Sequence, residues 1–217
     1  MNFETARRHM VDSQVRPHDV TDLRIQHAME VTPREIFVPA ELRDQVYVER
    51  EIEYAPGRRL LRARDFAKLV SAVDIRTDDI VLNAVCGSGY STAIIANLAE
   101  MVVSIESDEA LANTAQDNLT NLGFSNAAVL TGDPWDGAAK QGPFDVIFLG
   151  GVIERTPEKL LGQLKDGGAL ATIVHVDGVS RGGVFTKSND TVSFSPRFDA
   201  ASKAVLPGFE KTKAFKF

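Results

Sequence analysis

The sequence has a single cysteine, Cys86, among its 217 residues. One cysteine excludes an internal disulfide framework and is typical of a reducing compartment. No apolar run approaches the roughly 18 to 20 residues needed to cross a bilayer. Residues 1–10 carry Glu4, Arg7 and Arg8 with no apolar stretch behind them, which disfavours a secretory signal. These absences predict a soluble, cytoplasmic protein with no membrane partner.

An excess of positive charge is also missing. Lys plus Arg is 24 against 30 Asp plus Glu, a formal net charge of -6. Proteins that coat nucleic acid need a positive surface, so no nucleic-acid partner is expected. The histidines show no metal-ligand spacing, so no metal site is predicted; they are His9, His18, His27 and His175.

The chain divides into two regions of different pattern. Residues 1–73 show apolar residues at helical spacing, interrupted by prolines, and predict a helical N-terminal cap and substrate-side region. Helices are expected from Asp22 to Val31, from Pro39 to Gln45 and from Arg64 to Val73. Residues 74–217 are predicted to form a Rossmann-like domain that binds a cofactor.

Short β-branched runs alternate with helical patterns in the second region. Strands are expected at 80–84, 101–105, 127–130, 144–149 and 169–174; helices at 90–98, 111–119 and 157–164, the last ending at Gly167-Gly168. Shorter strands at 183–186, 191–194 and 214–217 predict an antiparallel edge. The fold class is therefore α/β: a doubly wound, mostly parallel Rossmann-like sheet with antiparallel C-terminal strands and the helical cap.

A glycine-containing loop follows the first expected strand. Gly87 and Gly89 let the backbone turn tightly and approach a ligand, and the next helix offers unpaired N–H groups. The dinucleotide fingerprint requires a third glycine where this chain has Thr92, so a nicotinamide enzyme is disfavoured.

Two further strand ends carry groups that suit a nucleoside. Glu106, 17 residues after Gly89, is placed to accept hydrogen bonds from both ribose hydroxyls. Asp133 and Trp135 follow the third strand and suit the amino group and flat face of adenine. The alternatives are that both acids are solvated turn residues and that Trp135 belongs to the core. The predicted cofactor-binding residues are Asn83, Cys86, Gly87, Ser88, Gly89, Glu106, Asp133 and Trp135. Cys86 is interpreted as loop packing rather than a nucleophile.

Several segments together resemble one family. They are MVDSQVR at 10–16, PREIFVP at 33–39, CGSGYSTAIIANLA at 86–99, GDPW at 132–135, PFDVI at 143–147 and LKDGG at 164–168. In order and spacing they are similar to protein-L-isoaspartate O-methyltransferases. The resemblance implies a class I methyltransferase with S-adenosyl-L-methionine as cofactor. It also implies an activity that methylates the carboxylate of damaged, isomerised aspartyl residues in a protein or peptide substrate, as in protein repair.

Three positions depart from the family pattern. Asn83 stands where the family has an acid, and Val85 replaces the first loop glycine. A valine forced to φ > 0 would cost ~1–3 kcal/mol, which weakens affinity roughly 5- to 150-fold. Aligning Gly57 places Leu61 where the family's acceptor-side serine falls. These departures motivate an alternative, a catalytically degenerate member that acts as a ligand-binding or protein-interaction module. A third possibility is a different methyl acceptor, such as a small carboxylic acid.

Four arginines occupy residues 58–64 of this acidic chain. One interpretation makes Arg58 and Arg59 substrate-binding residues, because guanidinium groups bind carboxylates bidentately. The other is a solvated basic face paired with Glu49, Glu51 or Glu53. No catalytic residue and no oligomeric state follow from the sequence.

Overall fold

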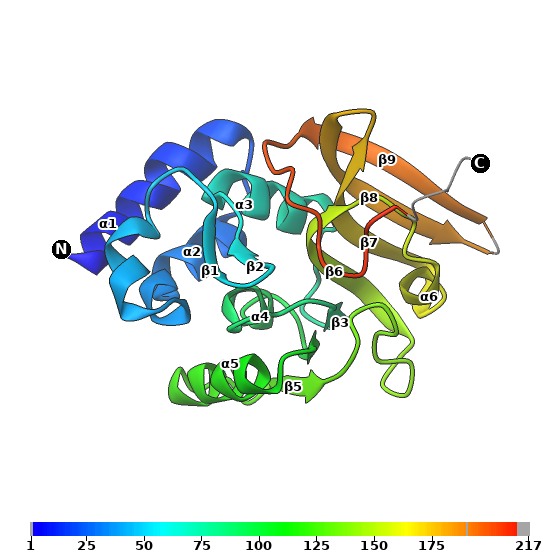
Figure 1. Cartoon of the computed structure of the whole chain (residues 1–217), viewed down its shortest axis with the longest axis horizontal. Coiled ribbons are helices and arrows are strands. Elements are labelled where there is room, and N and C mark those ends of the chain that lie inside the picture. Colours follow the sequence, from blue (N-terminus) through cyan, green and yellow to red (C-terminus); the bar gives the residue numbers. More distant parts are fainter. Residues whose placement is uncertain (1, 190, 212–217) are drawn as a thin grey trace, which may run out of the picture.

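A seven-stranded sheet with the strand order β5-β4-β3-β6-β7-β8-β9 forms the centre of the computed structural model, which describes residues 2–189 and 191–211 (Figure 1). The strands are β3 (Ile80–Asn83), β4 (Met101–Glu106), β5 (Ala127–Thr131), β6 (Phe144–Ile153), β7 (Leu164–Val176), β8 (Val179–Ser188) and β9 (Thr191–Asp199). The first five run parallel, and β8 and β9 are added antiparallel. The predicted α/β sheet with an antiparallel C-terminal edge is confirmed.

Five of the helices, α2 to α6, begin within two residues of the expected starts. They are α1 (Phe3–Met10), α2 (Leu23–Val31), α3 (Ala63–Ala72), α4 (Tyr90–Ala96), α5 (Glu109–Asn121) and α6 (Glu158–Leu161). The Asp22 side chain accepts a hydrogen bond from the Arg24 amide and starts α2, and Asp108 caps α5 in the same way. A π-helix, Val11–Val15, continues α1, and three 3-10 segments follow at Arg16–His18, Arg34–Phe37 and Ala40–Gln45. Figure 1 shows the N-terminal helices on the opposite side of the molecule from β9.

Strand alternation divides the buried side chains between two cores. Val81 and Val146 face a core that includes residues of α1 to α4, whereas Leu82 and Ile147 face a second core with α6 and Phe209. The helical cap thus shares its core with one face of the sheet. The boundary at residue 73 between the cap and the Rossmann-like domain stays a prediction.

Two local predictions were wrong. A two-stranded hairpin, β1 (Ile52–Ala55) and β2 (Arg58–Leu60), lies inside the region expected to be helical. The helix expected to end at Gly167-Gly168 stops at Leu161, and β7 has begun by Leu164 because its first residues pair with Phe144. The strand expected at 214–217 lies outside the described residues. Among those that are described, no helix combines the length and apolarity needed to span a membrane.

Candidate active site

The glycine loop connects β3 to α4 at the carboxyl edge of the parallel strands. Gly87 has φ +55° and Gly89 has φ +100°, backbone conformations that L side chains rarely adopt. A Cβ on Gly89 would also lie 3.3 Å from the Ala115 side chain of α5. The loop therefore needs these two glycines for its own geometry. Val85 is not among the residues with positive φ, so the strain expected from this substitution does not arise.

Glu106 ends β4, the strand next to β3, and its carboxylate is fully buried. It accepts hydrogen bonds from the backbone N–H of Gly87 at 2.9 Å and of Asp108 at 3.0 Å. The loop and Glu106 are therefore connected directly. As the sequence predicted, the tips of these two neighbouring strands lie together.

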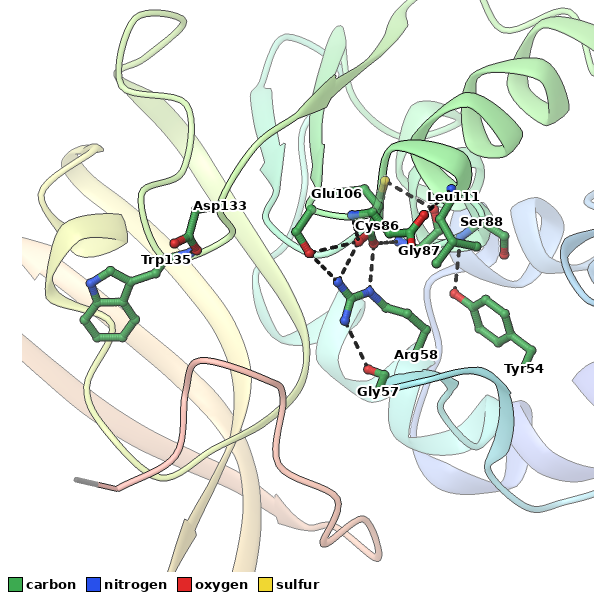
Figure 2. A network of polar contacts seen from close by, with 12 residues as sticks. Tyr54, Gly57, Arg58, Cys86, Gly87, Ser88, Glu106, Leu111, Asp133 and Trp135 are labelled. Carbon is green, nitrogen blue, oxygen red and sulfur yellow. Dashed lines mark hydrogen bonds and ion pairs between the residues drawn. The ribbon is translucent and has the colours of Figure 1, made fainter. Parts of the chain in front are cut away.

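Arg58 of β2 occupies the remaining side of this carboxylate. Its Nε donates to Glu106 Oε2 at 2.8 Å and its Nη2 donates to Oε1 at 2.5 Å, a bidentate pair between buried side chains (Figure 2). Nη2 also donates to Ser107 Oγ at 2.8 Å, and Nη1 donates to the Gly57 carbonyl at 3.3 Å. Arg58 was predicted to bind substrate at the mouth of the site. The structure places it inside, on the predicted ribose carboxylate.

The electrostatics of this pair keep both groups charged. Burial alone raises the pKa of Glu106, but hydrogen bonds from Arg58, Asp108 and Gly87 outweigh it, and the pKa lies below its ordinary value. The hydrogen bond to Glu106 raises the pKa of Arg58 despite burial.

This lowered pKa predicts a pH dependence of stability. The pKa of glutamate in the unfolded chain is 4.5, and in the folded protein the pKa of Glu106 is lower. The ionised carboxylate therefore stabilises the fold fully above the unfolded-state pKa. This contribution is lost as the pH falls through the folded-state pKa. We expect the stability difference between wild type and Glu106→Gln to be full at pH 7 and to shrink below about pH 4. Urea unfolding of both proteins at pH 7, 5 and 3.5 measures it. A difference that does not change with pH would contradict a charged Glu106.

Tyr54 of β1 covers the glycine loop from the same hairpin. Its hydroxyl accepts a hydrogen bond from the Ser88 N–H at 3.2 Å, and a Cβ on Gly87 would overlap that hydroxyl. Burial raises the pKa of Tyr54, so the phenol stays neutral at physiological pH. Sequence reasoning missed Tyr54. The signal was the Pro56-Gly57 turn between two short apolar-alternating segments, typical of a hairpin.

Three predicted cofactor residues direct their side chains into the protein. The amide nitrogen of Asn83 donates to Ser91 Oγ at 2.7 Å and Thr92 Oγ1 at 2.9 Å, tying β3 to α4. The Ser88 hydroxyl donates to the Phe37 carbonyl at 2.6 Å, so only the backbone of Ser88 faces the hairpin. Cys86 is buried, and burial together with Glu106 raises the pKa of its thiol. A neutral thiol fits the interpretation of Cys86 as loop packing.

Asp133 and Trp135 stand apart from this cluster (Figure 2). Asp133 Oδ1 accepts from the Trp135 N–H at 2.9 Å and so closes its own turn. The Trp135 ring lies 5.3 Å from the Phe209 ring, and the Arg155 guanidinium lies 3.6 Å above it. Phe209 and Arg155 thus hold the Trp135 ring. That Asp133 and Trp135 share one cofactor with Glu106 stays a prediction.

A small cavity remains beside the Arg58–Glu106 pair. Its volume is about 40 Å³. Its lining includes Tyr54, Arg58, Arg59, Leu61, Val85 and Gly150. Arg59, in contrast to Arg58, is partly exposed and pairs with Glu53 on the neighbouring strand. The expected pairing with an upstream glutamate is therefore confirmed for Arg59.

The family model for protein-L-isoaspartate(D-aspartate) O-methyltransferase matches residues 5–198. The chain belongs to this family. A protein-L-isoaspartate O-methyltransferase of Syntrophus aciditrophicus is 37% identical over 168 residues, 77% of either chain. One of Koribacter versatilis is 34% identical over 168 residues, 77% of this chain and 76% of the relative. The predicted resemblance is confirmed.

Solved structures show that the fold is the one of this isoaspartate methyltransferase family. A protein-L-isoaspartate O-methyltransferase superposes with a TM-score of 0.77 at 22% identity, over 93% of this chain and 66% of the other. A Plasmodium falciparum protein described as a beta-aspartate methyltransferase, in complex with S-adenosyl-L-homocysteine, gives 0.75 at 17% identity, over 92% of this chain and 97% of the other. Family membership therefore comes with the expected fold along nearly the whole chain.

The residues present fit a nucleoside cofactor of this methyltransferase family on one condition. The loop at Gly87–Gly89 gives close backbone approach, and Glu106 offers two carboxylate oxygens at the neighbouring strand tip. Arg58 and Tyr54 now bond to the Glu106 carboxylate and to the Ser88 N–H, which are groups predicted to bind the cofactor. The fit therefore requires both side chains to withdraw.

Proposed function

We propose that this chain is an S-adenosylmethionine-dependent methyltransferase that esterifies the side-chain carboxylate of isoaspartyl residues in proteins or peptides. The observation that carries the proposal is the match to the isoaspartate methyltransferase family over residues 5–198. The positive-φ glycines Gly87 and Gly89 and the buried Glu106 at adjacent strand tips support it. We further propose that the protein acts in the cytoplasm, as its single cysteine predicts.

On the cofactor side, we assign the ribose hydroxyls to Glu106 and the close backbone approach to Gly87 and Ser88. S-adenosylmethionine, when bound, supplies a methyl group activated by a sulfonium. Asp133 stays the proposed adenine-side group because it follows β5, which pairs with β4. Trp135 is not assigned, since Phe209 and Arg155 hold its ring.

On the acceptor side, the chain needs no strong base. The acceptor carboxylate, with a pKa near 4, is already ionised at neutral pH. Its residues contribute by aligning the acceptor and excluding water. Arg59 is the proposed anchor for the acceptor carboxylate, because it lines the cavity and is partly exposed at the surface. The cap formed by residues 1–73 contributes Arg59 and Leu61 to this side.

The degenerate-module alternative is not favoured. Val85 adopts no strained φ, and Asn83 makes hydrogen bonds inside the fold, so neither departure removes the cofactor loop. The absence of a hydroxyl at Leu61 affects alignment of the acceptor and not the cofactor side. A different acceptor is an outcome that the following experiment detects.

The experiment is methyl transfer from labelled S-adenosylmethionine to an isoaspartyl peptide. An otherwise identical aspartyl peptide is the control. We expect base-labile incorporation into the isoaspartyl peptide at least about 10-fold above the control, because discrimination depends on alignment of the acceptor. No incorporation into either peptide, together with no binding of S-adenosylhomocysteine, would overturn the proposed function. If small carboxylic acids were methylated instead, the proposed isoaspartyl acceptor would be wrong and a small carboxylic acid would take its place.

A further inference from the structure

We infer that Arg58 and Tyr54 of the β1–β2 hairpin, residues 52–60, are built-in competitors of the cofactor and set its affinity. Arg58 occupies the ribose-binding carboxylate, Tyr54 occupies the glycine loop, and the cofactor binds only when the hairpin withdraws both. This inference rests on the proposed function.

The hairpin satisfies the same polar groups that a nucleoside would need. Both oxygens of Glu106 accept from Arg58, at 2.8 and 2.5 Å. The Ser88 N–H donates to Tyr54 at 3.2 Å, and the Tyr54 hydroxyl lies where a Cβ on Gly87 would be. Figure 2 shows the Arg58 side chain at the Glu106 carboxylate and the Tyr54 side chain at Ser88. One small element thus blocks both halves of the site at once.

The space left in the site is too small for the ligand. The cavity has a volume of about 40 Å³, whereas ligand pockets usually measure roughly 300–1,000 Å³. Arg58 and Tyr54 both line this cavity, so their departure enlarges it from two sides. A cofactor can therefore occupy this cavity only after the hairpin side chains have moved.

The hairpin is built in a way that permits this movement. Its two strands pair with each other and form a sheet separate from the seven-stranded one. Two-stranded hairpins are marginally stable alone, so this one depends on its contacts with the rest of the protein. Ile52 and Leu60 supply apolar contacts near its base, while the turn at Gly57 lies against Pro207. Displacement of the hairpin leaves the parallel strands intact.

Only molecules with an open hairpin bind the cofactor. The apparent association constant is therefore the intrinsic one multiplied by the fraction of molecules that are open. Removing Arg58 removes the competitor and leaves Glu106 without its counter-charge, with the hydrogen bonds from Gly87 and Asp108 still in place, so both changes favour the ligand. Charge-assisted hydrogen bonds of this kind predict a gain of about 10- to 100-fold in affinity. Tyr54→Phe removes one weaker hydrogen bond and should gain about 2- to 5-fold.

The test is calorimetric titration of S-adenosylhomocysteine into wild type, Arg58→Ala and Tyr54→Phe. Arg50→Ala is the matched control, because Arg50 is exposed just before the hairpin and its side chain donates to Gln45, outside the site. We expect tighter binding for Arg58→Ala and Tyr54→Phe, and an unchanged Kd for the control. Hydrogen exchange of wild type supplies a second readout. S-adenosylhomocysteine should speed exchange in peptides that cover residues 50–62 and slow it in those that cover residues 84–90.

The outcomes separate the two claims. Equal or weaker binding by Arg58→Ala, or a hairpin that becomes protected on ligand binding, overturns the competitor role and leaves the proposed function standing. No binding to any folded variant, together with no methyl transfer to either peptide, overturns both. Should Arg58→Ala fail to fold, Tyr54→Phe and the exchange measurement on wild type decide the question.

Discussion

Replacing Glu106 by glutamine is expected to lower the free energy of unfolding by about 3 kcal/mol, because it leaves the Arg58 guanidinium in a buried position without its counter-charge. The carboxylate of Glu106 accepts from two backbone amides and from two nitrogens of Arg58, with no solvent exposure. The glutamine amide has one acceptor oxygen, and its N–H₂ group would face the N–H donors that now bond to the second carboxylate oxygen. Urea unfolding at pH 7 measures the loss.

Two further variants make this prediction specific. Glu109→Gln, at an exposed position in the first turn of α5, changes the same charge and should cost less than about 1 kcal/mol. The double variant Arg58→Leu with Glu106→Gln should be more stable than Glu106→Gln alone, because the unpaired cation is gone. If Glu106→Gln cost no more than Glu109→Gln, the buried pair would not contribute to the stability of the protein.

Arg34→Met is expected to reduce the free energy of unfolding by about 4 kcal/mol, because it removes two buried hydrogen bonds and a cation–π contact. Arg34 is 1% exposed, and its side chain donates to the carbonyls of Val46 at 2.9 Å and Leu61 at 2.7 Å. Its guanidinium lies 4.7 Å from the centre of the Tyr90 ring. Methionine fills much of the volume but leaves both carbonyls without a donor.

The control for this variant is Arg43→Met, an exposed arginine in the neighbouring 3-10 segment. It should change stability by less than about 0.5 kcal/mol. Chemical denaturation of both variants, with equal m-values, makes the comparison valid. A loss below about 1 kcal/mol for Arg34→Met would show that water or other donors replace the guanidinium.

The parallel sheet could be predicted from the sequence because its signals are local. The run from Ile80 to Leu82 is apolar and precedes the loop with Gly87 and Gly89, and Met101 to Ile105 is again largely apolar. Glu106 was placed at a strand tip by counting from Gly89. The helix start expected at Asp22 agrees with the structure, where its side chain caps the backbone of α2.

The contacts that fill the site could not be predicted, because they join distant segments. Arg58 and Glu106 are 48 residues apart, and nothing in either segment specifies the other. Four clustered arginines suggested one common role. The structure separates the buried Arg58 from Arg59, which pairs with Glu53. Trp135 likewise depends on Phe209, far along the chain.

The most direct test of this account is a crystal structure of the protein with S-adenosylhomocysteine. The account predicts the nucleoside over the Gly87–Gly89 loop, its ribose hydroxyls on the Glu106 carboxylate, and Arg58 and Tyr54 withdrawn with the hairpin. An intact Arg58–Glu106 pair in crystals grown with saturating ligand, with no nucleoside beside the loop, would contradict it.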